Sequence, residues 1–153
     1  MSGALSLYLV AGEPSGDRLG AGLMRALRQA VPEVAFRGVG GPEMAAEGLE
    51  SRFDMAELSV MGLAEVLPRL PRLVRRLRET VADVVAAAPD ALVTIDSPGF
   101  TLRLAERVRA RAPGIRTIHY VAPSVWAWRP GRAAAMARYV DHVLALLPFE
   151  PDH

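Results

Sequence analysis

Short apolar runs, each followed by a turn rich in glycine or proline, recur along this chain of 153 residues. These runs occupy residues 5–10, 34–39, 91–96, 115–121 and 142–147. An apolar run without alternating polar residues is typical of a strand buried on both faces. Segments with helical spacing separate most of the runs, so the sequence predicts an α/β fold: a parallel sheet with helices on both faces.

The spacing of apolar residues predicts helices over residues 17–30, 43–47, 98–112 and 132–140. A basic amphipathic pattern covers residues 63–78, and Pro68 and Pro71 interrupt it. An interior proline removes a backbone hydrogen bond and clashes with the preceding turn. We therefore expect the two prolines to shorten any continuous helix in this segment.

The composition is that of one soluble globular domain, with 51% hydrophobic and 23% charged residues. The first apolar run has no basic residue before it, and no stretch approaches the ~20 apolar residues of a membrane span, so we expect neither a signal peptide nor a transmembrane helix. A net charge of +1 argues against a nucleic-acid partner. The absence of cysteine fits a reducing cytoplasm, and the absence of lysine excludes a P-loop.

Four loops follow the predicted strands at the edge of the sheet where ligands collect in α/β proteins. They read AGEPSGD (11–17), GVGGPEM (38–44), DSPGF (96–100) and APSVWAWR (122–129). None completes the glycine spacing of a dinucleotide site, which argues against a nicotinamide-dependent oxidoreductase. The three histidines, His119, His142 and His153, lack ligand spacing, so we predict neither a metal nor a cofactor.

The loop AGEPSGD allows two interpretations of equal weight. Ser15 is placed to cap the following helix, and Asp17 in its first turn suits the positive end of the helix dipole. Alternatively, Gly12 and Gly16 allow the backbone to approach a bound sugar or phosphate.

Asp96 ends a buried strand, and Ser97 and Pro98 after it have the character of a helix cap and a first helical residue. Because Ser97 can cap the helix, Asp96 beside Phe100 is available as a general base. The alternative is an aspartate that only accepts hydrogen bonds from a neighbouring loop.

Residues 63–78 allow three interpretations: a helix packed on the sheet, a helix that binds a partner, or a surface that contacts a membrane through its apolar stripe and arginines. The apolar stripe consists of Leu63, Val66, Leu67, Leu70, Leu73 and Val74. Its arginines would suit an anionic headgroup.

Six blocks in this order closely resemble the N-terminal half of the lipid A disaccharide synthases: VAGEPSGDRLGAGLMRAL, GVGGPEMAAEG, LSVMGLAEVL, IDSPGF, TIHYVAPSVWAWRPGR and LLPFE. The resemblance implies a Rossmann-like domain over residues 1–153, the acceptor side of a GT-B-type fold, with the UDP-binding domain outside this chain. The family transfers 2,3-diacylglucosamine from UDP to 2,3-diacylglucosamine 1-phosphate (lipid X), with inversion and without a metal. It works in the cytoplasm at the surface of the inner membrane.

The resemblance also implies roles for individual residues. Asp96 falls on the family's essential aspartate and would be the base, and the stripe at 63–74 falls on its membrane-contacting patch. The expected substrate-binding residues are Gly12, Glu13, Ser15, Gly16, Asp17, Pro98, Phe100, Tyr120, Pro123, Ser124, Trp126, Trp128 and Arg129. Many members carry a second aspartate where this chain has Gly99, so that acid is missing here. The competing hypothesis is a non-catalytic module that binds a nucleotide or a lipid on the same fold.

Overall fold

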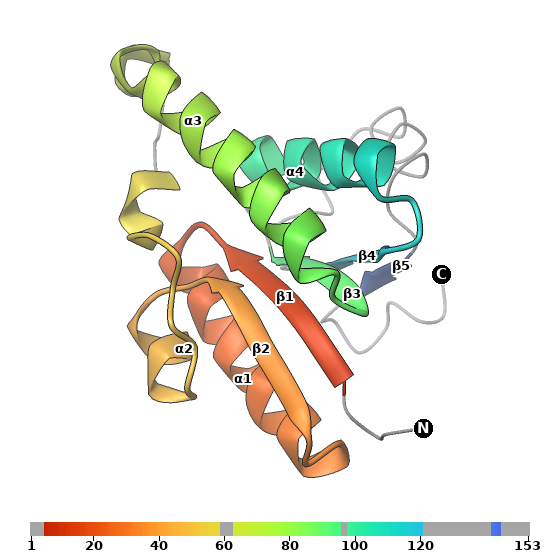
Figure 1. The fold of residues 1–153 in the computed structure, drawn as a ribbon. Helices are drawn as coiled ribbons and strands as arrows, with labels where there is room; N and C mark the ends of the chain where they lie inside the picture. The colour runs from red at the N-terminus through yellow and green to blue at the C-terminus, as the bar shows by residue number, and fades with distance from the viewer. Residues whose placement is uncertain (1–4, 59–62, 96–97, 121–141, 145–153) are drawn as a thin grey trace, which may run out of the picture.

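One parallel sheet organises the molecule (Figure 1). The computed structural model describes residues 5–58, 63–95, 98–120 and 142–144, with the backbone alone at 63–66, 98 and 142–144. Within this part of the chain the strands are β1 (Leu5–Ala11), β2 (Val34–Val39), β3 (Ala91–Ile95), β4 (Arg116–Tyr120) and β5 (His142–Leu144). Their order is β2-β1-β3-β4-β5, and every pairing is parallel. The predicted parallel α/β fold is confirmed.

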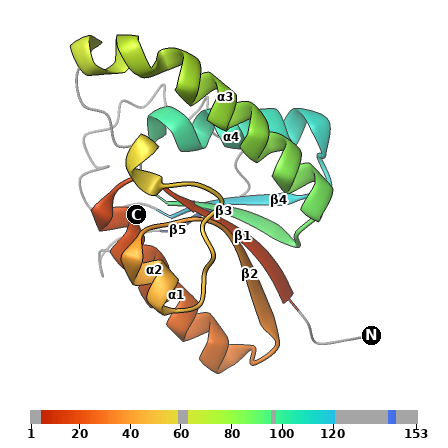
Figure 2. The same cartoon turned by 60° about the vertical axis from the view of Figure 1, so that its left-hand side comes forward.

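Helices cover both faces of this sheet (Figure 2). They are α1 (Pro14–Ala30), α2 (Pro42–Ala46), α3 (Leu63–Ala87) and α4 (Pro98–Arg111), and a short 3-10 helix, η1, spans Met55–Leu58. One face carries α3 and α4, and the other carries α1 and α2. The helix predicted at 132–140 lies outside the described residues, as do the ends of several predicted strands.

Burial follows the position of each strand in the sheet. The central strand β3 is buried at every residue, and β1 is buried from Leu7 onward, which explains their continuous apolar sequences. The edge strand β2 instead alternates over its first four residues, where Val34 and Phe36 are half-buried and Ala35 and Arg37 are exposed. In β2, at the edge of the sheet, alternate side chains point to a face that is open to solvent, so a polar residue such as Arg37 is tolerated there.

The start of α1 differs from the prediction. The helix begins at Pro14 rather than Asp17, its cap position is Glu13, and no side chain caps it by a hydrogen bond. The expectation that Ser15 caps this helix is therefore wrong, because Ser15 already lies inside the first turn. Proline favours this early start, since its fixed φ suits the first helical position and its missing N–H is not needed there.

The helix α3 also differs from the prediction, because it runs unbroken for 25 residues through Pro68 and Pro71. Both prolines lie in its first half, where the side chains from Leu67 to Arg72 are exposed and water can hydrate the carbonyls that lose their partner. Its second half is anchored in the core through Leu77, Val81 and Val84. Tertiary packing therefore outweighs the local cost of the prolines. Among the described helices, none is long and apolar enough to cross a membrane.

Candidate active site

The carboxyl ends of four strands meet in register at one edge of the sheet. Ala11 pairs with Ile95, Ile95 with Tyr120, and Tyr120 with Leu144. Asp96 follows Ile95 directly in the sequence, so the chain enters the predicted base position from the centre of this edge. Asp96 itself lies outside the described residues, as do Pro123, Ser124, Trp126, Trp128 and Arg129.

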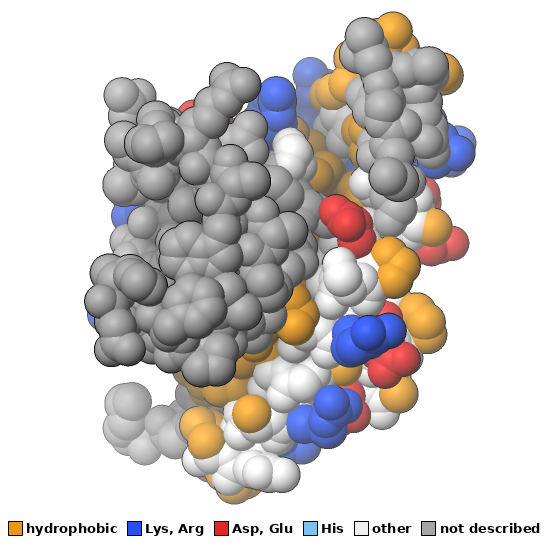
Figure 3. Space-filling model, turned by 180° about the vertical axis from the view of Figure 1, so that it is seen from behind, with side chains coloured by type: hydrophobic (Ala, Val, Ile, Leu, Met, Phe, Trp, Pro, Cys, Tyr) orange, Lys and Arg blue, Asp and Glu red, His pale blue; other side chains and the backbone are white. Residues whose placement is uncertain are grey.

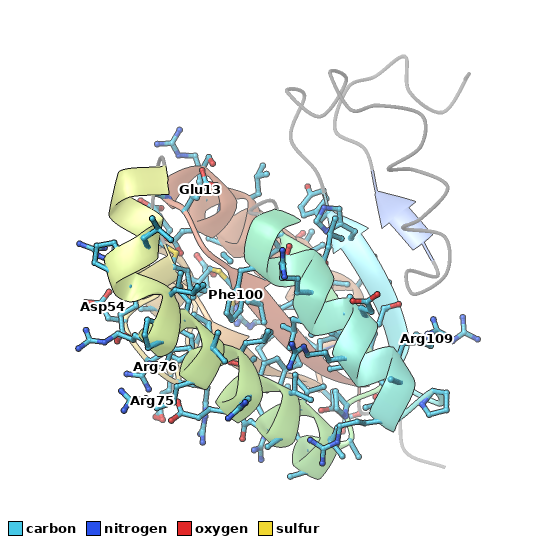
Figure 4. All side chains as sticks on the ribbon, turned by 90° about the horizontal axis from the view of Figure 1, so that it is seen from above. Glu13, Asp54, Arg75, Arg76, Phe100 and Arg109 are labelled. Atoms are coloured by element: carbon cyan, nitrogen blue, oxygen red, sulfur yellow. The ribbon has the colours of Figure 1, made fainter. Side chains whose placement is uncertain are left out.

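The loop after β1 separates into an exposed and a buried set of residues. Glu13 and Ser15 are exposed, whereas Gly12, Gly16 and Asp17 are buried. Figure 4 shows Glu13 at the end of the molecule where α1 begins. The exposed pair is thus accessible beside the positive end of the α1 dipole, while the buried three belong to the support of the loop.

Gly16 brings α1 into close contact with the sheet edge. A Cβ atom at this position would lie 3.3 Å from the carbonyl oxygen of Ile95 and 3.5 Å from the Cβ of Ala11. A larger residue would push the first turn of α1 away from β1 and β3. The glycine therefore holds this turn against the residue that precedes Asp96.

The Asp17 carboxylate joins two of the four edge loops. Its Oδ1 accepts backbone N–H bonds from Gly41 and Met44, and its Oδ2 accepts one from Glu43, each at 2.9 Å. Asp17 is only 2% exposed. A Cβ atom on Gly41 would lie 2.7 Å from Oδ2, so glycine at 41 is what permits this approach. The carboxylate thus satisfies the amides at the beginning of α2, a role that the sequence did not indicate.

The N-terminal turn of α4 carries the next candidates. The helix begins at Pro98, as predicted, although the side chain of Pro98 is not described. Phe100 is half-buried and packs against the core, and Figure 4 shows it between α3 and α4. Gly99, beside Phe100 in the first turn of α4, is exposed and has open space around it.

The end of β4 holds one candidate and one buried histidine. Tyr120 is half-buried, and burial raises the pKa of its phenol. The Nδ1 of His119 lies 2.8 Å from the Thr94 hydroxyl, and burial lowers the pKa of this imidazole to about 4. His119 is therefore neutral at pH 7. Among the described residues, no group of His, Cys, Asp and Glu side chains could hold a metal ion.

A family model described as lipid-A-disaccharide synthetase matches residues 7–153. The chain belongs to this family. Relatives called lipid-A-disaccharide synthase share 62% identity with it in Ruegeria pomeroyi, over 97% of this chain, and 60% in Nitrobacter hamburgensis, over 95%. This synthetase-family chain spans 37% of the length of each of these two relatives.

Solved structures share the fold of this synthetase-family chain at low identity. A putative UDP-N-acetylglucosamine 2-epimerase from Listeria monocytogenes matches 92% of this chain and 38% of its own, with a TM-score of 0.60 at 12% identity. The glycosyltransferase SnogD from Streptomyces nogalater matches 94% of this chain and 43% of its own, with a TM-score of 0.54 at 16% identity. The predicted Rossmann-like architecture is confirmed by these matches.

The predicted membrane stripe of this synthetase-family chain lies on the first half of α3. Leu67 is 58% exposed, Leu70 46% and Val74 36%, whereas Leu73 is half-buried against the core. The side chains of Leu63 and Val66 are not described. In Figure 3, hydrophobic and basic side chains lie next to one another around the start of α3, at the upper right.

A polar cavity of about 230 Å³ lies under α3, at a place that no sequence pattern indicated. The Tyr8 hydroxyl donates to Asp83 at 2.6 Å, and the Nε of Arg52 lies 3.2 Å from the same carboxylate oxygen. Burial, followed by the bond to Asp83, raises the pKa of Tyr8. These groups satisfy one another, so they fasten α3 to β1 rather than present an open site.

Next to this cavity, Arg76 connects α3 to the segment before it. Its guanidinium makes two bonds to Glu57, at 2.9 and 3.0 Å, and lies 4.8 Å from the centre of the Phe53 ring. Figure 4 shows Arg76 on the same outer side of α3 as Asp54. This pairing joins the second half of α3 to the segment that contains η1.

Proposed function

We propose that this chain is the acceptor-side domain of a lipid A disaccharide synthase. The whole enzyme would transfer 2,3-diacylglucosamine from UDP to the 6′-hydroxyl of 2,3-diacylglucosamine 1-phosphate, forming a β-1,6 disaccharide and releasing UDP. Membership of the synthetase family over residues 7–153 is the observation that carries the proposal. The sheet supports it, because β3, which Asp96 follows in the sequence, lies between β1 and β4.

In the proposed mechanism, Asp96 acts as the general base. Its carboxylate takes the proton of the acceptor hydroxyl as that oxygen attacks the anomeric carbon of the donor sugar. The new carbon–oxygen bond forms on the face opposite the leaving UDP, so the anomeric configuration inverts. The bond to UDP breaks with its electron pair, and charges outside this chain stabilise the diphosphate.

The loop after β1 has separate proposed roles for its exposed and buried residues. Glu13 and Ser15 are exposed at the start of α1, where the helix dipole favours an anionic or polar group, and we assign them to substrate contact. Asp17 positions this loop against the turn at Gly41 through its three backbone bonds. Asp17 therefore acts on the substrate through the loop, as a positioning residue.

The exposed apolar side chains of α3 are the proposed contact with the cytoplasmic surface of the inner membrane. Three apolar residues, Leu67, Leu70 and Val74, are exposed on one helix, and arginines flank them. This arrangement is typical of a helix that lies in the membrane interface. Both proposed substrates carry acyl chains, so an enzyme at this interface meets them without extracting them into water.

An assay of glycosyl transfer tests the proposal. The chain is mixed with the remainder of the Ruegeria pomeroyi relative, expressed separately, and supplied with UDP-2,3-diacylglucosamine and lipid X. We expect activity in the mixture and a loss of at least about 100-fold for Asp96→Asn, because a general base contributes a factor of this order. Asp54→Asn is the matched control, since Asp54 is exposed and its carboxylate accepts a hydrogen bond from Ala56 in its own turn.

Two results would contradict the proposal. One is full activity of Asp96→Asn in a mixture whose two parts associate. The other is a folded and associated pair that binds UDP-2,3-diacylglucosamine but transfers nothing, which would favour a binding module without catalysis.

A further inference from the structure

A groove of about 220 Å³ lies between α3 and α4, away from the edge that carries the candidate active site. Arg78 and Val81 of α3 line one wall, and Arg107, Ala110 and Arg111 of α4 line the other. Figures 1 and 4 both show the two helices side by side on the same face of the sheet. Since α4 begins at the carboxyl edge of the sheet, its last two turns place this groove toward the opposite edge.

Three arginines line this groove without an acidic partner in the part of the chain that the structure describes. Ion pairs elsewhere join Arg25 and Arg28 to Glu47, and Arg76 to Glu57 and Glu79. The guanidinium groups of Arg78, Arg107 and Arg111 form no ion pair with any described carboxylate. On a chain whose net charge is only +1, this is a local excess of positive charge.

The spacing along α4 aligns two of these arginines. Arg107 and Arg111 are four residues apart, so their side chains lie one above the other on the same helix face. Arg109 is turned elsewhere, because it donates to the Thr117 hydroxyl at 3.3 Å. Arg78 approaches from α3 on the opposite wall, so the groove is basic on both sides.

Two apolar side chains complete the lining of the groove. Val81 of α3 is only 3% exposed, and Ala110 of α4 contributes its methyl group. The three arginines are exposed, so an anion can reach them from solvent, and their combined positive charge attracts it. Guanidinium forks match the several oxygens of a phosphate group, and three forks exceed what one carboxylate can accept.

We propose that the groove between α3 and α4 is a binding site for a phosphate group, held by Arg78, Arg107 and Arg111. The phosphate can belong to a small soluble compound or to the headgroup of a phospholipid. The assignment to a phospholipid headgroup rests on the proposed membrane contact. The phosphate site itself is independent of that contact.

The face of α3 favours a headgroup as the source. Leu67, Leu70, Val74, Arg78 and Val81 follow one another at intervals of three or four residues, so they share one face of the helix. Arg78 is four residues beyond Val74, a rise of about 6 Å along the axis. The basic groove thus continues the exposed apolar stripe, as a lipid with an anionic headgroup and acyl chains would require.

Titration of the whole chain with inorganic phosphate at constant ionic strength, followed by backbone amide NMR shifts, tests the site. We expect saturable shifts that centre on residues 78–81 and 107–111. The double variant Arg107→Gln/Arg111→Gln is expected to weaken binding by at least about tenfold, because it removes charge-assisted hydrogen bonds. Arg103→Gln is the matched control, an exposed arginine one turn earlier on α4 that does not line the groove.

Vesicle sedimentation distinguishes the two sources. A headgroup source predicts that the double variant binds phosphatidylglycerol vesicles more weakly while phosphatidylcholine binding is unchanged. A soluble source predicts that the double variant and the unaltered chain bind vesicles equally, although the double variant still binds inorganic phosphate more weakly. The proposal would be overturned if chloride produced the same backbone amide shifts as phosphate, or if the shifts persisted unchanged in the double variant. The variant Leu67→Ser/Leu70→Ser should keep phosphate binding, so failure of the membrane contact is separable from failure of this site.

Discussion

Asp17 supplies a side-chain partner to backbone amides that the short helix α2 cannot satisfy by itself. The first amides of any helix lack an intrahelical partner, and here the amide of Met44 is buried and those of Gly41 and Glu43 are partly buried. Asp17→Ala should therefore lower the free energy of unfolding by roughly 2–4 kcal/mol. Asp17→Asn should have an intermediate effect, because one amide oxygen can still accept the bonds from Gly41 and Met44 while its NH₂ group faces the amide of Glu43.

Urea denaturation of the two variants measures this effect. Asp54→Ala serves as the comparison, since its carboxylate caps an exposed turn through the single bond to Ala56. Its loss should stay below about 1 kcal/mol. Equal stability of Asp17→Ala and the unaltered chain would show that the carboxylate contributes nothing to holding the two loops.

His119 makes the stability of the fold depend on pH. Burial lowers the pKa of this imidazole from 6.5 to about 4 in the folded chain. Between these values the unfolded chain binds more protons, so the free energy of unfolding falls as the pH decreases from 6.5 toward 4. The contribution amounts to roughly 2–3 kcal/mol across this window.

Urea denaturation at several pH values between 7 and 4 measures this contribution. His119→Asn keeps a polar atom near the position of Nδ1, which lies beside Thr94, but cannot titrate. The variant should lose part of the pH dependence between 6.5 and 4. An unchanged slope in this window would mean that other groups account for it.

At the scale of elements, α3 combines two halves with different tasks. Leu77, Val81 and Val84 bury its second half in the core, and Leu67 and Leu70 remain exposed on its first half. A helix whose anchoring is confined to one half can tolerate Pro68 and Pro71 in the other. Leu67 and Leu70 form an exposed apolar surface, so substitutions there should change the free energy of unfolding little.

The variant Leu67→Ser/Leu70→Ser tests the proposed membrane contact. Each leucine that enters the interface contributes about 1.5–3 kcal/mol, so the double change should weaken binding to phospholipid vesicles by at least about tenfold. Its stability in urea should remain close to that of the unaltered chain, because both side chains are about half exposed. Ala82→Ser, an exposed change on the same helix, should bind vesicles normally. Unaltered binding of the double variant would place the membrane contact elsewhere.

At the scale of the whole molecule, the chain has a core of its own on both faces of the sheet. The core includes Tyr8 and Leu92 from the strands, Met24 from α1, Val84 from α3 and Leu104 from α4. Such a core favours independent folding of this part of the synthetase fold.

If the remaining length of the relatives carries the UDP site, the chain should fold cooperatively yet bind UDP weakly. We expect a single urea transition and an affinity for UDP at least about 100-fold below that of the full-length Ruegeria pomeroyi relative, a difference of about 3 kcal/mol. Isothermal titration calorimetry measures both affinities. Equal affinities would move the nucleotide site into this chain.

Local sequence patterns determined where several strands and helices form in this chain. The run at 91–96 predicted the strand Ala91–Ile95 because burial on both faces leaves an unbroken apolar sequence. The run at 34–39 matches the edge strand β2, and the predicted helix start at Pro98 matches α4, since proline suits a first helical turn. The same runs indicated the edge at which the loops meet. The six sequence blocks indicated the family, and the synthetase model matches residues 7–153.

Only the tertiary structure decided how distant residues meet. Asp17 receives its partners from 24 to 27 positions away, and Arg78 meets Arg107 through the packing of two helices. The continuity of α3 likewise depends on the core against which its second half packs. Sequence patterns record the environment of each residue along its own element, whereas these features arise from contacts between elements, whose geometry no local pattern specifies.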